Sequence, residues 1–150
     1  MHFDPDNPVV ALCAAGMAVE GDREQARALF ERAWSIRRDD YEASIAAHFL
    51  ARHQPTIAET LAWNEHALRH ATTVSDGRTV EFLASLYLNV GDSYLAVGRL
   101  ADAATAAELA DANLAVLPAG GYRDFVERGI RGLAERIAAA ERDAANTPND

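Results

Sequence analysis

Residues Leu86 to Leu114 read LYLNVGDSYLAVGRLADAATAAELADANL, and this stretch decides the fold. Apolar residues three and four positions apart form one stripe before Gly98 and another after it, which is the spacing of a helical face. The stripes are Tyr87, Val90, Gly91, Tyr94 and Leu95, then Leu100, Ala103, Ala107, Ala110 and Leu114. A glycine between two such faces predicts a tight turn between two helices. Because two short helices cannot bury their apolar faces alone, we expect the hairpin to be repeated.

Two earlier segments repeat this hairpin. The positions 43 residues before Tyr94, Ala103 and Ala110 hold Ala51, Thr60 and Ala67. The positions a further 34 residues back hold Met17, Ala26 and Ala33. The first segment matches the last in residue type, with Gly21 at the expected turn, whereas the middle segment matches mainly in its spacing and has Pro55 at its turn.

A helix-turn-helix repeat of 34 residues is the period of the tetratricopeptide family, and the chain resembles a tetratricopeptide-repeat protein over about residues 7–117. The motif positions are Gly91, Tyr94, Gly98, Ala103, Ala107 and Ala110 in the last unit, Ala14, Met17, Gly21, Ala26, Phe30 and Ala33 in the first, and His48, Ala51, Pro55, Thr60, Asn64 and Ala67 in the middle. The longer spacing is similar to that of the kinesin-light-chain-like branch.

The resemblance implies an all-α fold, a right-handed α-solenoid of three helical hairpins that form a single domain over residues 1–150. The expected repeats are about 7–40, 41–74 and 75–117, followed by a helix at about 122–142 and a polar tail at 143–150. The extra residues before the last repeat predict a lengthened helix from about 78 to 97. The last helix caps the apolar end of the solenoid, with a role in a dimer interface left open.

The charge and residue composition of the chain argue against some classes of partner and location. The formal net charge is −9, with 14 arginines and no lysine, which argues against a nucleic-acid or membrane-surface binder because both need a positive surface. The start of the chain does not resemble a secretory signal, and no apolar run is long enough to cross a membrane, so we expect a cytoplasmic protein. Cys13, the one cysteine, is expected to be a buried thiol.

No motif for catalysis or for a cofactor is found, so we expect a non-enzyme without a cofactor. His66 and His70 lie four residues apart, a spacing that can hold a metal ion, but no third ligand is placed beside them. We therefore expect exposed histidines and no metal site.

The first helix of each tetratricopeptide hairpin lines a concave groove, and the resemblance implies a peptide- or protein-binding groove here. Its expected residues are Glu42, Ile45, Phe49, Arg52 and His53 in the second unit, Ser85, Leu88, Asn89 and Asp92 in the third, and Tyr122 and Arg123 of the last helix. An asparagine can donate and accept hydrogen bonds together, which suits a peptide backbone. Ala11 and Ala15 replace the polar residues of the family's carboxylate clamp, so a chaperone-tail adaptor is not expected.

The leading hypothesis is a non-catalytic adaptor for a peptide or protein partner of unknown identity. Two alternatives stay open: a regulatory module that senses a signal peptide or a small ligand, and a self-assembling structural protein, such as a homodimer. The sequence alone does not name the partner.

Overall fold

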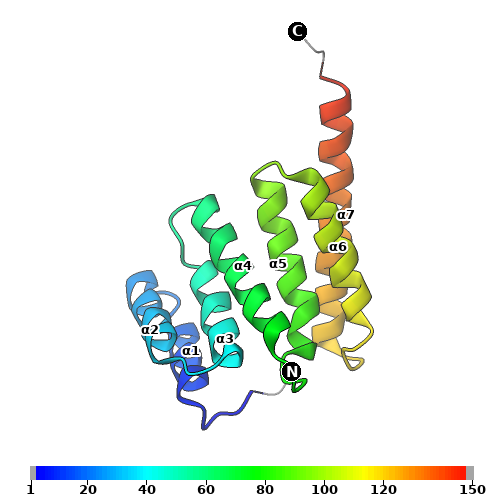
Figure 1. Ribbon diagram of the computed structural model, residues 1–150. Coiled ribbons are helices and arrows are strands. Elements are labelled where there is room, and N and C mark those ends of the chain that lie inside the picture. The colour runs from blue at the N-terminus through cyan, green and yellow to red at the C-terminus, as the bar shows by residue number, and fades with distance from the viewer. Residues whose placement is uncertain (1–2, 148–150) are drawn as a thin grey trace. The chain divides into compact units, whose positions relative to one another are not determined.

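The computed structural model describes residues 3–147, and within them the fold is all-α, as predicted, with helices packed in sequence-adjacent pairs and no strand (Figure 1). The elements are α1 (Pro8–Ala18), α2 (Arg23–Ile36), α3 (Asp40–Ala51), α4 (Ile57–Thr73), the 3₁₀ turn η1 (Val80–Phe82), α5 (Leu83–Ala96), α6 (Leu100–Leu114) and α7 (Gly121–Ala145).

Side-chain caps fix where α1, α2 and α4 begin. Asn7 accepts hydrogen bonds from the amides of Val9 and Val10, and Asp22 accepts one from Gln25. The Thr56 hydroxyl accepts from the Glu59 amide and donates to the Glu59 carboxylate. Each cap satisfies an amide that the first helical turn leaves without a partner. Asn7, Asp22 and Thr56 therefore cap α1, α2 and α4, and all three are residue types favoured at a helix start.

The predicted lengthening of the fifth helix is wrong, because α5 begins at Leu83 rather than near residue 78. A turn occupies the start of the expected helix: Asp76 accepts from the Arg78 amide, and Gly77 has a φ of 85° that favours glycine. Thr79 is buried, and its hydroxyl donates to the Ala71 carbonyl at the end of α4. The extra residues thus form a connector closed onto α4, followed by the 3₁₀ turn.

The described residues form two compact units that divide between Phe82 and Leu83. In the first unit, Phe30 stacks on Phe49 with ring centroids 5.4 Å apart and lies 5.0 Å from the ring of His53. Gly16 of α1 lies against the same ring, so α1, α2 and α3 meet there. Phe3, before α1, packs on Phe82 with centroids 5.3 Å apart, which ties the segment before α1 to the end of the unit.

The second unit contains α5, α6 and α7 around a core of small and aliphatic side chains. These are Ala84, Leu88, Ala103, Ala107, Ala110, Leu114, Leu117, Val126, Ile130, Leu133 and Ile137. Gly91 allows the close approach of α7, because a Cβ atom at that position would lie 2.7 Å from Leu133. The predicted last helix is present and continues to Ala145, three residues beyond the expected end. The expectation of a polar tail concerns in part residues 148–150, which lie outside the described residues.

Candidate functional site

The groove face predicted for the second hairpin is mostly inside the first unit. Glu42, Ile45, Phe49 and His53 are 2%, 4%, 6% and 7% exposed, and only Arg52 reaches the surface. The expectation that these four side chains face an open groove is therefore wrong. Phe49 is turned to the stack with Phe30, so it belongs to the core rather than to a surface.

Glu42 holds the start of α3 to the rest of the first unit. Its carboxylate accepts from the Arg38 guanidinium at 2.6 Å, from the Arg38 amide at 2.6 Å and from the Asn7 side chain at 2.9 Å. These hydrogen bonds, chiefly that of the Arg38 side chain, lower the pKa of Glu42 although burial opposes them. A carboxylate with this many internal donors has a structural role.

Arg52 and His53 are held by one acidic side chain. Glu20, in the turn after α1, lies 3.1 Å from the Arg52 guanidinium and 3.4 Å from the Nε2 atom of His53. The Nδ1 atom of His53 is buried without a hydrogen-bond partner. The two residues predicted to line the groove thus fasten the end of α3 to the α1–α2 turn.

The groove face predicted for the third hairpin lies in the second unit and meets α7. Leu88 is buried and packs against Gly129 of α7. A Cβ atom at position 129 would lie 2.6 Å from the Cδ2 atom of Leu88. Asp92 pairs with Arg136 of α7 at 2.5 Å, with both side chains about half exposed. Ser85 and Asn89 are half-buried on the same helix. This part of the predicted site is brought together, but its carboxylate is already neutralised within the unit.

The two residues predicted from the last helix have different surroundings. Tyr122 is 36% exposed at the start of α7. Arg123 donates to the Leu117 carbonyl at 3.3 Å, so it fastens the α6–α7 connector.

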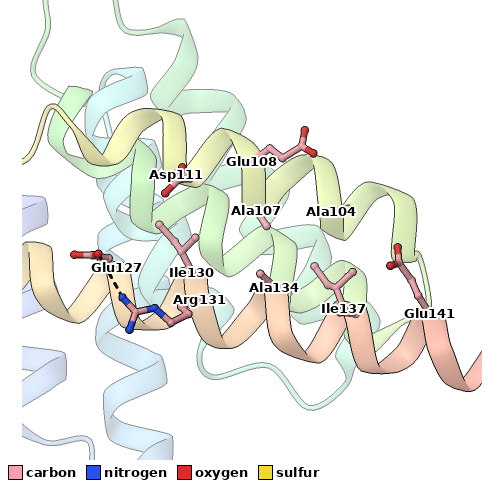
Figure 2. A pocket seen from close by; sticks show the side chains of 11 residues that line it. Ala104, Ala107, Glu108, Asp111, Glu127, Ile130, Arg131, Ala134, Ile137 and Glu141 are labelled. Atoms are coloured by element: carbon pink, nitrogen blue, oxygen red, sulfur yellow. Dashed lines mark hydrogen bonds and ion pairs between the residues drawn. The ribbon is translucent and has the colours of Figure 1, made fainter.

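A groove of about 480 Å³ lies between α6 and α7 in the second unit (Figure 2). This α6–α7 groove is lined by Ala104, Ala107, Glu108, Asp111, Glu127, Ile130, Arg131, Ala134, Ile137, Ala138 and Glu141. None of the residues predicted from the sequence to bind a partner lines this groove.

The α6–α7 groove has an apolar floor and an acidic rim. Figure 2 shows Ile130, Ala134 and Ile137 in a row along α7, on the side that faces Ala107 of α6. Four carboxylates and one guanidinium stand around this floor: Glu108, Asp111, Glu127, Glu141 and Arg131. Arg131 and Glu127 are 3.5 Å apart, exposed, and on successive turns of α7. The arrangement suits an apolar surface with positive charges at its edges.

A signal for this groove is present in the sequence, spread over two helices. Small residues at 104, 107, 134 and 138 alternate with acidic residues at 108, 111 and 141. Each helix alone looks like an ordinary amphipathic helix with a charged outer face. Only the packing of α6 on α7 brings the two alanine rows together.

The remaining candidate residues have structural partners. His66 and His70 stack with ring centroids 6.3 Å apart, and His70 lies 2.6 Å from the Asp40 carboxylate. Desolvation and the nearby cations, first among them Arg69, lower the pKa of His66. Over residues 3–147, no group of three or more His, Cys, Asp or Glu side chains is placed to hold a metal ion.

Cys13 is buried as expected, and burial raises the pKa of its thiol to about 12.

Within the described residues, no helix has both the length and the apolar character that a membrane crossing needs. Comparisons of the chain with family models, with curated proteins and with solved structures find no match.

Proposed function

We propose that this chain is a non-catalytic protein-interaction module, a right-handed solenoid of tetratricopeptide-like hairpins that binds a peptide or protein partner. The observation that carries the proposal is the α6–α7 groove, whose apolar floor of nearly buried Ile130 and Ile137 and exposed Ala134 lies inside an acidic rim. A concave surface with an apolar lining and a few polar groups at its edge is the usual form of a binding site.

The polar groups of the groove support binding rather than catalysis. Its carboxylates are distributed along both edges of an exposed groove about 480 Å³ in volume. General acid-base catalysis needs a group with a matched pKa held against a reacting atom, usually in a site that excludes water. Exposed carboxylates around an apolar floor are instead suited to the attraction and orientation of a charged partner.

The proposal is tested by affinity capture from a lysate of the source organism, compared among variants by mass spectrometry. Ala134→Arg places a long charged side chain on the exposed floor of the groove. Ala112→Arg adds the same side chain to an exposed position of α6 that does not line the groove. We expect a partner that is retained by the wild type and by Ala112→Arg and is lost by Ala134→Arg.

A third variant tests the surface that the sequence predicts. The double variant Asn89→Ala, Asp92→Ala removes the polar groups of α5 and breaks the ion pair with Arg136. Loss of the partner from this variant alone moves the binding surface to α5. If the wild type captures no partner under any condition, the proposal of an interaction module is wrong.

Self-association is a second candidate function, favoured by the composition of α1. No charged residue occurs between Pro8 and Val19, and Ala11, Ala14, Ala15, Met17 and Ala18 are exposed. A helix that is apolar on all sides is normally buried. Light scattering on the wild type and on Ala15→Arg tests this candidate, which predicts a dimer for the wild type and a monomer for the variant.

A further inference from the structure

Helix α4 covers the surface that α2 and α3 form together. The ring of Trp63 meets the ring of Trp34 edge-on, with centroids 4.9 Å apart. His70 lies two turns after Trp63 on the same face of α4. Its ring is 5.9 Å from the Trp34 ring, and its Nδ1 atom is 2.6 Å from the Asp40 carboxylate of α3. Asn64, Ala67 and Ala71 of α4 are buried. A pair of packed helices of this kind therefore presents a surface that one further helix fills.

Helices α6 and α7 present the corresponding surface without a further helix. By the repeat spacing, Ala103 and Ala110 correspond to Ala26 and Ala33, and all four are fully buried. Asp111 then corresponds to Trp34, the residue on which α4 packs, and Asp111 lines the open groove. A groove between two helices can bind a third, amphipathic helix. That helix contacts the groove through apolar side chains spaced three and four residues apart.

The charges of the groove define the kind of helix. Four carboxylates stand at the rim against one guanidinium, and that guanidinium is already beside Glu127. Glu108 and Asp111 lie along α6, and Glu141 lies near the far end of α7 (Figure 2). An incoming helix with Lys or Arg on both sides of an apolar stripe places opposite charges along both edges, and this complementarity steers association and fixes orientation.

A second copy of the chain is a poor occupant. The chain has no lysine and a net charge of −9, so a second copy is on balance repelled by the acidic rim. The floor also favours a different chain, because its alanines at 104, 107, 134 and 138 leave room for larger aliphatic side chains. Small residues on one surface are best filled by large residues on the other.

From these observations we infer that the α6–α7 groove accepts a cationic amphipathic helix of a partner protein, seated against α6 and α7 as α4 is seated against α2 and α3. This inference rests on the proposed interaction function and adds the chemistry of the partner. The occupant contacts Ile130, Ala134 and Ile137 through leucine-sized side chains and reaches Asp111 and Glu108 with its basic ones.

The test uses the full-length chain and a synthetic peptide of roughly five helical turns. The peptide carries leucine at positions i, i+4, i+7 and i+11, with lysine and arginine on the flanks of that stripe. A scrambled peptide of the same composition keeps the charge but has no apolar face. Fluorescence anisotropy measures binding, and circular dichroism of the mixture measures the gain of helix. We expect binding with a gain of helix for the amphipathic peptide only.

Two matched pairs of variants locate the binding. We expect Ala134→Arg to weaken binding at least about tenfold and Ala112→Arg to change it less than about twofold, since only the former blocks the groove. We expect Asp111→Lys to weaken binding about three- to tenfold and Glu135→Lys, an equal change of charge outside the groove, to have a small effect. Raising the salt concentration should reduce the difference within the second pair. Circular dichroism and thermal unfolding verify that every variant is folded.

The inference is overturned if the scrambled peptide binds as tightly, if Ala134→Arg binds as the wild type does, or if no binding is seen at a peptide concentration of about 100 μM. The proposed function fails separately, when the lysate holds no partner for the wild-type chain. If a captured partner is lost by Ala134→Arg but the segment cross-linked to α7 is not a basic helix, the interaction function stands and this inference is wrong.

Discussion

At the scale of single residues, Glu42 is the side chain on which the start of the second hairpin depends. It is 2% exposed and accepts hydrogen bonds from Arg38 and Asn7. We predict that Glu42→Ala lowers the free energy of unfolding by about 1–3 kcal/mol, because it removes the buried charged acceptor of hydrogen bonds from Arg38 and Asn7. Urea denaturation followed by circular dichroism measures this change.

Glu31→Ala is the matched control for Glu42→Ala. Glu31 also pairs with an arginine four residues away, at 2.8 Å, but both side chains are largely exposed. Exposed pairs of this kind contribute about 0.3–0.5 kcal/mol. Equal effects of the two substitutions would contradict the structural role assigned to Glu42.

The pKa of Glu42 gives the direction of a pH effect. The folded state lowers this pKa below its ordinary value of 4.5, so the folded state binds the proton less readily than the unfolded state. The stability that results is present above about pH 4.5 and is lost as the pH falls through the lowered value. Glu42→Gln should therefore unfold with a weaker dependence on pH below 4.5 than the wild type does.

His48 adds a second pH effect in a different window. Desolvation, with a smaller contribution from Arg52, lowers the pKa of His48 from 6.5 to about 4. The unfolded chain therefore binds a proton between pH 6.5 and 4 that the folded chain does not, and stability falls with the pH over that range. The loss is about 2–3 kcal/mol for this half-buried ring.

Chemical denaturation at pH 7 and pH 5 measures the loss caused by His48. We predict that His48→Gln removes most of the difference in unfolding free energy between the two pH values. His66→Gln is a suitable comparison, because the pKa of His66 is also lowered but its ring is on a surface cluster. If the wild type and His48→Gln lose stability equally between pH 7 and pH 5, the effect does not come from His48.

At the scale of helices, two glycines have contrasting surroundings: Gly16 is closely packed and Gly132 has open space beside it. A Cβ atom at Gly16 would lie 2.3 Å from the ring of Phe30, which Phe49 and His53 hold in place. At Gly132 of α7, a Cβ atom would meet nothing within 4 Å. We predict that Gly16→Ala lowers the free energy of unfolding by about 1–3 kcal/mol, whereas Gly132→Ala raises it by about 0.5–1 kcal/mol through helix propensity.

Thermal unfolding of both glycine variants tests these predictions: the unfolding temperature should fall for Gly16→Ala and rise for Gly132→Ala. Each variant adds the same methyl group to the interior of a helix, so the two serve as controls for one another. A rise in unfolding temperature for Gly16→Ala would show that Phe30 can move aside and that the α1–α2 contact is loose.

Local chemistry explains which elements were predictable. The caps at Asn7, Asp22 and Thr56 and the glycine at residue 98 mark helix ends in the sequence itself, and the structure has helix ends beside all of them. The start of α5 was misplaced because Thr79 is fixed by the distant Ala71 carbonyl, a contact that no local pattern announces. The repeat spacing showed that extra residues were present but not which conformation they take.

At the scale of the whole molecule, the chain divides into two compact units. The core of the second unit is formed by residues between Ala84 and Ile137, with Leu133 fully buried at its centre. We predict that Leu133→Ala destabilises this unit by about 2–5 kcal/mol. Hydrogen exchange should then accelerate in α5, α6 and α7 while the amides of α1 and α2 keep their rates. Uniform acceleration would mean that the chain unfolds as one cooperative body.

The candidate site was harder to predict than the fold. The helix faces that the repeat pattern assigns to a groove hold Ile45, Phe49 and His53, and in the structure these side chains are buried. Helical periodicity says which residues share a face but not whether another helix covers that face. The α6–α7 groove arises differently, where two rows of alanines on neighbouring helices meet and leave a shallow space between their acidic edges.

The most direct test of the account places a photo-cross-linking residue at position 134 or at position 112 and illuminates the protein in a lysate of the source organism. Both positions are exposed alanines, and only Ala134 lies in the α6–α7 groove. The account predicts a discrete cross-linked partner from position 134 and none from position 112. Equal adducts from both positions, or a partner from position 112 alone, would contradict a binding site between α6 and α7.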